Sequence, residues 1–320
     1  MAGFGLLLWM VHKIGFSALK ENLLRFGFAR TLALILIYGA AQICFCLAWY
    51  FILIDPQKKL TFWKTFLAYA AGDALNMTIP SGNLAGEPVK VMLVRDIIPL
   101  ESAITSVTIY KFSDFLSMTL FLLLGWLFHF RFFTLPLSWD IGAGIVIFGM
   151  SAVSVLLFLL QKRGFYHPTG KWLQKIGPLE NWIENKLGQA HLVDKGIRDF
   201  YTGRPGNFML SLLFNFLAWF GGVLEIALFT AMAGLPVNFP AALTIETFSL
   251  FINNVIFFVP ARIGVGEGGR VLLFMTLGYS AQAGMSYGII RRVRESAWIG
   301  LGLLILVLFK RGQAERKPAL

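Results

Sequence analysis

The sequence predicts an all-α, polytopic membrane protein with about six transmembrane helices and two re-entrant helical hairpins in an inverted-topology repeat. Three observations lead to this prediction: an apolar composition, long unbroken apolar runs, and two further apolar runs interrupted by proline and glycine. Hydrophobic residues make up 57% of the chain and charged residues only 14%, whereas soluble domains contain about a quarter charged residues. We therefore treat 1–320 as a single integral membrane domain.

The unbroken apolar runs are long enough to cross a bilayer, because a spanning helix needs about 20 apolar residues. They cover 30–54, 100–130, 138–161, 205–234 and 280–309. A shorter run, from Phe4 to Val11, is expected to be either the end of a truncated first helix or a segment at the membrane interface. If it crosses, the crossings total about six.

The two interrupted runs cover 61–97 and 241–278. Each half holds about 15 residues, which is too short to span comfortably, so each run predicts a hairpin that enters and leaves on one side. Irregular backbone at membrane depth must be covered by protein or line a water-filled cavity. The residues assigned a structural role at the two tips are Pro80, Gly82, Gly86, Pro260, Gly264 and Gly266.

The two hairpins are related by an internal repeat. An ungapped shift of 180 residues gives 8 identities over the 32 positions from Pro80 to Lys111, and it places Glu87 on Glu267. We assign pseudo-repeats to 30–132 and 210–310. The chain is expected to cross the membrane three times between equivalent points, so the repeats should be inverted, with the tips near the midplane.

The distribution of basic residues predicts the orientation. With six crossings, 15 Lys and Arg residues lie on the side of the termini and 5 on the other, which predicts a plasma (inner) membrane protein with both termini cytoplasmic. The cytoplasmic segment 162–204 connects the repeats and contains an amphipathic helix near Leu179–Leu187. This helix is expected either at the membrane interface or against a soluble partner.

Charged residues lie inside the apolar segments, where each costs on the order of 3 kcal/mol at the bilayer centre. Glu87 and Lys90 stand three residues apart and share a helix face. The same spacing relates Glu267 to Arg270, Lys111 to Asp114, and Arg291 to Arg294. Either these residues form salt bridges that tie the hairpins to neighbouring helices, or they line a polar cavity for a headgroup.

The excess of basic residues and the half-helix N-termini beyond Pro80 and Pro260 favour an anionic group such as phosphate. Glu87 and Glu267 are either helix caps or proton-coupling carboxylates. The predicted substrate-binding residues are Asn83, Glu87, Lys90, Lys111, Asp114, Arg262, Glu267, Arg270, Arg291 and Arg294.

The sequence does not support a metal site, a cofactor site or a dinucleotide site. The four histidines have no metal-ligand spacing, and Cys44 and Cys46 lie within an apolar run, so neither a metal nor a cofactor is expected. The segment 264–269 matches GxGxxG, but no strand precedes it. We interpret the net charge of +11 as orientation and attraction to anionic lipid, and we expect no nucleic-acid partner.

The segments 79–90 and 259–267 resemble the Pro…Gly-Glu-Pro…basic and Pro…Gly-Leu/Ile-Gly-x-x-Glu signatures of the lysylphosphatidylglycerol synthase transmembrane region, a flippase-like family of integral membrane proteins. Lys111 and Asp114 look like the family's basic-x-x-Asp pair, with Lys where Arg is usual, and Arg291 looks like the basic residue of the second half. The resemblance covers nearly the whole chain. The chain ends shortly after its last apolar run, so aminoacylation, which a separate soluble domain performs in the full synthases, is not expected.

The resemblance implies translocation of a lipid or lipid-linked substrate, with members connected to aminoacylated phospholipid, polyprenyl-phosphate glycan or hopanoid pathways. We accordingly expect a non-enzymatic translocator of an anionic lipid. One alternative is an accessory subunit that positions a partner enzyme of lipid biosynthesis. The other is a membrane-embedded transferase using Glu225 or Glu246.

Overall fold

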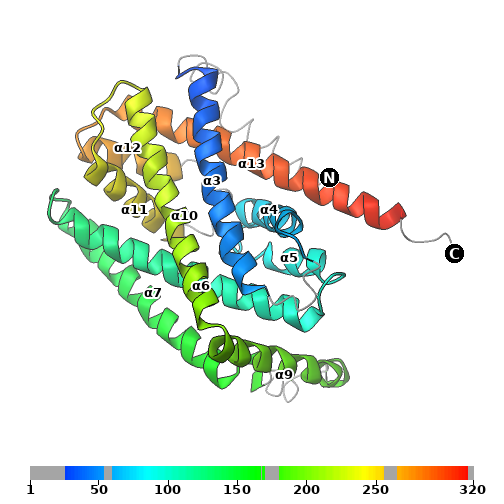
Figure 1. Ribbon diagram of the computed structural model, residues 1–320. Helices are drawn as coiled ribbons and strands as arrows, with labels where there is room; N and C mark the ends of the chain where they lie inside the picture. The colour runs from blue at the N-terminus through cyan, green and yellow to red at the C-terminus, as the bar shows by residue number, and fades with distance from the viewer. Residues whose placement is uncertain (1–25, 54–59, 167, 170–179, 256–264, 316–320) are drawn as a thin grey trace.

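The computed structural model describes residues 26–53, 60–166, 168–169, 180–255 and 265–315. Within these ranges all the regular secondary structure is helical, and there is no strand. Figure 1 shows the helices in the order α3 (Phe28–Ile52), α4 (Phe62–Thr78), α5 (Glu87–Val94), α6 (Leu100–His129), α7 (Leu137–Arg163), α9 (Glu180–Gly203), α10 (Pro205–Met232), α11 (Phe239–Val255), α12 (Val265–Thr276) and α13 (Ala281–Glu315).

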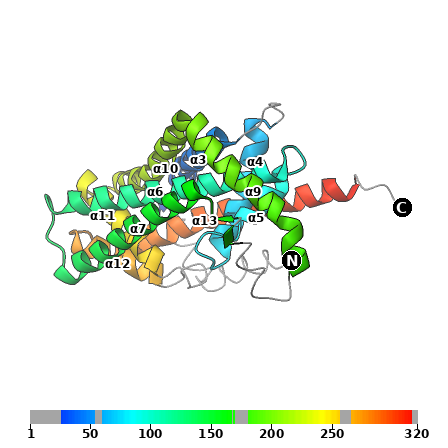
Figure 2. The same ribbon diagram turned by 90° about the horizontal axis from the view of Figure 1, so that it is seen from below.

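Four of the described helices, α3, α6, α7 and α10, are long and apolar enough to cross a membrane. They coincide with the predicted runs 30–54, 100–130, 138–161 and 205–234 to within a few residues. The fifth predicted run, 280–309, also forms one helix, α13, but Arg291, Arg292, Arg294 and Glu295 interrupt its apolar sequence. The C-terminal end of α13 extends past the other helices (Figures 1 and 2).

Proline marks the beginning of several helices, because its fixed φ suits the first turn and its missing N–H removes no helical hydrogen bond. Pro99 and Pro136 immediately precede α6 and α7, and Pro205 is the first residue of α10. Pro88 lies in the first turn of α5, directly after Glu87. The same residue type therefore sets where both spanning and short helices start.

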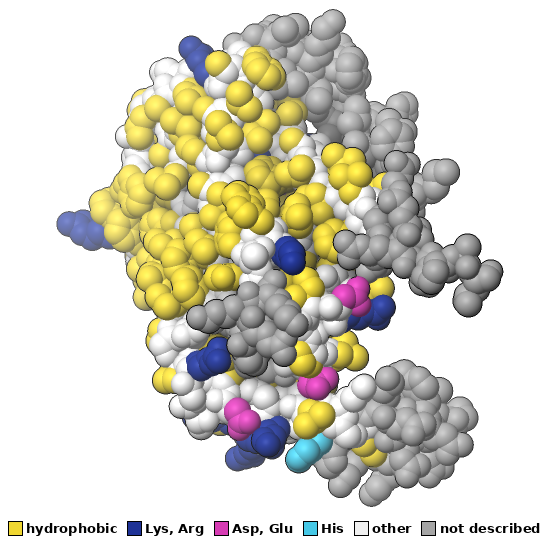
Figure 3. Space-filling model, turned by 45° about the vertical axis from the view of Figure 1, so that its right-hand side comes forward, with side chains coloured by type: hydrophobic (Ala, Val, Ile, Leu, Met, Phe, Trp, Pro, Cys, Tyr) yellow, Lys and Arg dark blue, Asp and Glu magenta, His cyan; other side chains and the backbone are white. Residues whose placement is uncertain are grey.

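The exterior is largely apolar, as expected for a surface that faces lipid. Figure 3 shows hydrophobic side chains spread broadly over the described surface, with a group of charged side chains at its lower end. Helix α7 contributes exposed Ile145, Phe148 and Leu156, and α10 contributes exposed Leu213 and Leu224. The charged residues of the spanning region instead lie mostly inside the protein.

Helices α3 and α10 lie side by side and run in opposite directions (Figure 1). Phe51, near the end of α3, stacks on Phe214 near the beginning of α10, with ring centroids 5.4 Å apart. Phe26, just before α3, stacks on Phe229 near the end of α10, also at 5.4 Å. The first helices of the two predicted repeats are therefore neighbours of opposite polarity.

The remaining helices of the two halves pack reciprocally. Helix α4 of the first half contacts α13 of the second, and α11 of the second half contacts α6 of the first. Both contacts are close: a Cβ on Gly302 would collide with the backbone oxygen of Ala70, and a Cβ on Gly125 would collide with Thr247. Glycine permits this backbone approach between membrane helices.

The predicted break at Ile79–Gly82 lies between α4 and α5. Gly82 and Asn83 both adopt positive φ, 63° and 62°, and reverse the chain there. The two helices then meet at glycine, since a Cβ on Gly86 would collide with the backbone oxygen of Gly72. In the second half, α11 ends at Val255 and α12 begins at Val265, so Pro260, Arg262 and Gly264 lie outside the described residues.

The connector packs onto the first half through α9. Val193, Ile197 and Phe200 are buried in the core that α9 shares with α6. Asp194 accepts hydrogen bonds from the backbone N–H groups of Phe165 and Tyr166, at 2.9 and 3.0 Å, and so joins α9 to the end of α7. The apolar face of α9 from Val193 onward is thus covered by this chain itself. The predicted amphipathic surface at Leu179–Leu187 lies largely outside the side chains that the structure describes.

Candidate functional site

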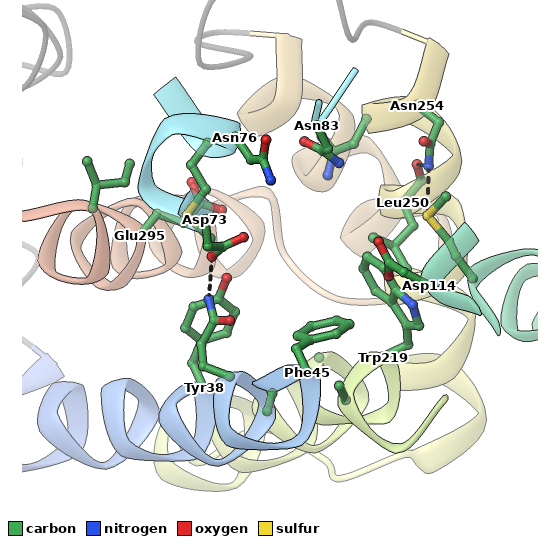
Figure 4. A pocket seen from close by; sticks show the side chains of 18 of the residues that line it. Tyr38, Phe45, Asp73, Asn76, Asn83, Asp114, Trp219, Leu250, Asn254 and Glu295 are labelled. Atoms are coloured by element: carbon green, nitrogen blue, oxygen red, sulfur yellow. Dashed lines mark hydrogen bonds between the residues drawn. The ribbon is translucent and has the colours of Figure 1, made fainter. Parts of the chain in front are cut away.

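A polar cavity of about 180 Å³ lies between the two halves of the protein. Residues from α3, α4, α5, α6, α10, α11, α12 and α13 line it, together with the segment between α4 and α5. Figure 4 shows Tyr38, Asp73 and Glu295 on one side of the space and Asp114, Trp219 and Asn254 on the other. Both predicted repeats therefore contribute to one cavity.

The cavity brings together most of the predicted binding and tip residues. Its lining includes Pro80, Gly82, Asn83, Lys90, Lys111, Asp114, Arg270, Arg291 and Arg294. Glu87, Gly86, Glu267 and Gly266 do not line it, and the two glutamates lie behind it as counter-ions. The position of the three remaining predicted residues, Pro260, Arg262 and Gly264, is not described.

Glu87 anchors the first-half network. Its Oε1 accepts hydrogen bonds from Asn76 Nδ2 at 2.9 Å and from Lys90 Nζ at 3.1 Å. Asn76 also accepts a hydrogen bond from the backbone N–H of Gly86, at 2.7 Å. Because Asn76 is on α4 and Glu87 begins α5, this network joins the two short helices just behind the turn. Glu87 and Lys90, which the sequence places on one helix face, form an ion pair.

Lys90 is almost fully enclosed, with 1% of its surface exposed. Its ammonium lies 4.8 Å from the ring centroid of Tyr69, 4.7 Å from that of Tyr110 and 5.9 Å from that of Trp49. Aromatic faces attract a cation, and the attraction is largest where water is excluded. Lys90 therefore connects α5 to α3, α4 and α6.

Lys111 on α6 is the more accessible of the two basic residues that the first half contributes to the cavity lining. Its Nζ lies 2.9 Å from Asp114 Oδ2 and 4.0 Å from Glu87 Oε1, and 23% of its side chain is exposed. The Lys111–Asp114 pair predicted from sequence is confirmed as an ion pair. Lys111 lines the cavity with a partly exposed side chain, so a ligand in the cavity can approach it.

The second-half network is centred on α13. Arg291 makes a two-pronged contact with Glu246 of α11, from Nη1 to Oε2 at 2.6 Å and from Nη2 to Oε1 at 3.1 Å. Arg294 pairs with Glu225 of α10, and its guanidinium lies 3.7 Å from the ring centroid of Tyr38. These charge-assisted contacts are strong because both partners are buried and correctly oriented. They fasten α13 to three other helices.

Glu267 has a different partner from the one its spacing suggests. It pairs with Arg292 of α13 rather than with Arg270 three residues further along α12. Arg292 also lies 3.1 Å from Glu295. This cross-helix pairing is the hairpin-to-neighbour salt bridge that we left open as an interpretation, and it accounts for Glu267 but not for Arg270.

Two charged residues of the cavity have no ion-pair partner within the described part of the chain. Arg270 is 5% exposed, and its Nε makes no hydrogen bond there. Asp73 accepts a hydrogen bond from Gln42 Nε2 at 2.9 Å, and Gln42 in turn accepts one from the hydroxyl of Tyr69 at 2.9 Å. No basic residue pairs with Asp73 among these residues. The cavity thus combines charged residues held in ion pairs with two that have no ion-pair partner among the described residues.

Several lining residues were absent from the predicted site. They are Tyr38, Gln42, Tyr69, Asp73, Asn76, Tyr110, Glu246, Asn253, Arg292 and Glu295. The 180-residue shift aligns Asp73 with Asn253, which was a usable signal for both. Neutral polar residues such as Gln42 carry little signal within an apolar helix. The described residues contain no group of three His, Cys, Asp or Glu side chains arranged to hold a metal.

Comparison with protein families supplies the wider context. A family described as "Lysylphosphatidylglycerol synthase TM region" matches residues 1–303, and the chain belongs to this family. No curated protein matches the chain, and no solved structure does. The family match agrees with the resemblance carried by the two hairpin motifs and identifies the protein as a membrane domain of this kind.

Proposed function

We propose that this member of the family moves a lipid, or a lipid-linked substrate with an anionic headgroup, between the leaflets of the plasma (inner) membrane. The observation that carries the proposal is the polar cavity lined by both halves of an otherwise apolar helical protein. A headgroup could occupy the cavity while its acyl chains stay in the lipid outside. Such a path lowers the cost of taking a polar group through hydrocarbon.

We also propose that the two halves form an inverted repeat with two re-entrant hairpins. The antiparallel contact of α3 with α10 and the reciprocal packing of α4 on α13 and α11 on α6 are the relations expected of inverted halves. A cavity at the interface of such halves opens to either side when one half tilts against the other. We therefore propose that the segments around Pro80 and Pro260 lie near the membrane midplane.

The charge of the lining supports an anionic headgroup. Six basic residues line the cavity: Lys90, Lys111, Arg270, Arg291, Arg292 and Arg294. Most are neutralised by carboxylates, so the wall is polar without carrying a large excess of charge. Lys111 and Arg270 are the two most available to a ligand. We also propose that both termini are cytoplasmic and that a lipid-biosynthesis enzyme is the partner that supplies the substrate.

Translocation can be tested in liposomes that contain the purified protein and trace fluorescent anionic lipid. An impermeant quencher added outside should bleach nearly all the label if the protein equilibrates the leaflets, and only the outer-leaflet share in protein-free vesicles. Lys111→Gln should slow the exchange. Arg131→Gln, which changes an exposed residue in the loop between α6 and α7, should not. Unchanged leaflet distribution for phospholipid, polyprenyl phosphate and hopanoid probes would refute the proposal.

The transferase alternative would require Glu225 or Glu246 as an acid or base. In this structure both carboxylates are buried counter-ions of Arg294 and Arg291. We therefore assign them to holding α13 in place. Product formation by the purified protein that is abolished by Glu246→Gln, in a variant shown to remain folded, would reverse this assignment.

A further inference from the structure

Lys90 and Arg270 occupy equivalent positions in the 180-residue repeat, yet their surroundings differ. Lys90 has an ion pair with Glu87 at 3.1 Å and three aromatic rings within 6 Å. Arg270 is similarly buried, with 5% of its surface exposed, but it forms no ion pair with any described residue. Its charged neighbours include Arg291, Arg292 and Glu295, and Glu295 already contacts three other arginines.

The difference comes from one extra arginine in the second half. Glu267 stands three residues before Arg270, just as Glu87 stands before Lys90, but Glu267 is paired with Arg292 on α13. The first-half position equivalent to Arg292 is Phe112, which stacks on Phe158 and Phe208 and offers no charge. Glu87 therefore pairs with Lys90, whereas Glu267 pairs with Arg292, and Arg270 lines the cavity without an ion-pair partner among the described residues.

An unpaired buried charge is costly, so its presence calls for a partner that arrives from outside the chain. A guanidinium presents its N–H groups in a planar fork that matches the oxygens of a phosphate or carboxylate. Arg270 is the only basic residue lining the cavity that has no ion-pair partner among the residues described. Arg291 and Arg292 line the same cavity and add positive charge to the wall that a ligand anion would face.

We infer that Arg270 is the residue that directly binds the phosphate group of the substrate, and that the two halves divide their roles. The second half binds the anion. The first half, in which Lys90 is paired with Glu87, positions the hairpin of α4 and α5 against the bound anion. This inference rests on the proposed function for its lipid substrate. The recognised chemistry, a phosphate mono- or diester oxygen, is shared by a phospholipid headgroup and free phosphate.

Binding and stability measurements on the purified full-length chain in neutral detergent test the inference. The probes are dioctanoyl phosphatidylglycerol, inorganic phosphate and dioctanoylglycerol, which lacks phosphate. Binding is followed by tryptophan fluorescence, because Trp219 lines the cavity, and by the shift in unfolding temperature. The variants are Arg270→Gln, Arg270→Lys, Lys90→Gln and the exposed control Arg131→Gln.

We expect Arg270→Gln to weaken binding of phosphatidylglycerol at least tenfold, Arg270→Lys to weaken it less, and Arg131→Gln to leave it within twofold. Without ligand, Arg270→Gln should unfold no earlier than the wild type, because it removes an unpaired charge, whereas Lys90→Gln should unfold earlier. Tighter binding of phosphatidylglycerol than of inorganic phosphate identifies a lipid source. The reverse order identifies free phosphate, and both results support the phosphate site.

Three results would overturn the inference. One is wild-type affinity for phosphatidylglycerol in Arg270→Gln, and another is no binding of either phosphate probe to the wild type. The third is an equal loss of dioctanoylglycerol binding in Arg270→Gln, which would indicate general damage. Translocation is scored separately in liposomes. Arg270-dependent binding without lipid movement would refute translocation alone, and movement unaffected by Arg270→Gln would refute the role of Arg270 alone.

Discussion

Gly222 of α10 lies against the ion pair between Glu246 and Arg291, and replacing it with alanine should break that pair. A Cβ at Gly222 would collide with the Glu246 carboxylate, which makes both prongs of the contact with Arg291. Glu246 is 2% exposed, so the carboxylate has little room to move aside. The substitution thus weakens the ion pair that holds α13 against α11, without removing any charged group.

The magnitude follows from two opposing effects. Losing one partner of a buried ion pair costs about 3–5 kcal/mol, while replacing glycine by alanine within a helix gains about 1 kcal/mol. Arg291 retains Glu295 at 3.5 Å and the Tyr287 hydroxyl at 3.2 Å, so the loss should fall at the lower end. We expect Gly222→Ala to lower the free energy of unfolding by about 2–3 kcal/mol.

Equilibrium unfolding in mixed detergent micelles, followed by tryptophan fluorescence, measures this change. Gly149→Ala is the matched control, because Gly149 also lies within a spanning helix and an added Cβ there meets no atom within 4 Å. That control should be neutral or stabilising by up to about 1 kcal/mol. If Gly222→Ala acts through Glu246, its cost should largely disappear in a Glu246→Ala background. Equal costs in both backgrounds would refute the reasoning.

Three further predictions concern the hairpin, the connector and the topology. Gly86→Ala should destabilise the protein by about 2 kcal/mol or more, because its Cβ would collide with the Gly72 backbone oxygen; unchanged unfolding would contradict the close approach. Asp194→Ala should cost about 1–3 kcal/mol through two lost backbone hydrogen bonds and should increase proteolysis around α9, with Asp194→Asn as the milder comparison. In a background free of native cysteines, an impermeant maleimide should label Phe132→Cys from outside the cell and Gly188→Cys only after lysis; the opposite pattern would overturn the proposed orientation.

Much of the fold could be predicted because hydropathy and chain breaks are local properties of a sequence. The runs that became α3, α6, α7 and α10 are recognisable by length and composition alone. Pro80 and Gly82 likewise predicted the end of α4 and the reversal before α5. The midplane position of the hairpins and the inverted membrane topology stay predictions, since they depend on where the bilayer lies.

The site was only partly predictable. Spacing of three residues correctly paired Glu87 with Lys90 and Lys111 with Asp114, because both members of each pair share one helix face. The same rule failed for Glu267, whose partner Arg292 comes from another helix. Contacts of that kind depend on which helices pack together, and spacing along one helix carries no information about them.

The sequence by itself determined that the chain is apolar and helical and that several charges must be sheltered from lipid, and it predicted an internal repeat. Only the tertiary structure decided which charges neutralise one another. Glu246 reaches Arg291 across 45 positions of sequence, because α11 and α13 converge where Gly222 leaves space for the carboxylate. By engaging Glu267, Arg292 leaves Arg270 without a partner at the cavity wall. Hydrophobicity is carried by each residue, whereas the pairing of buried charges is a property of the packed helices.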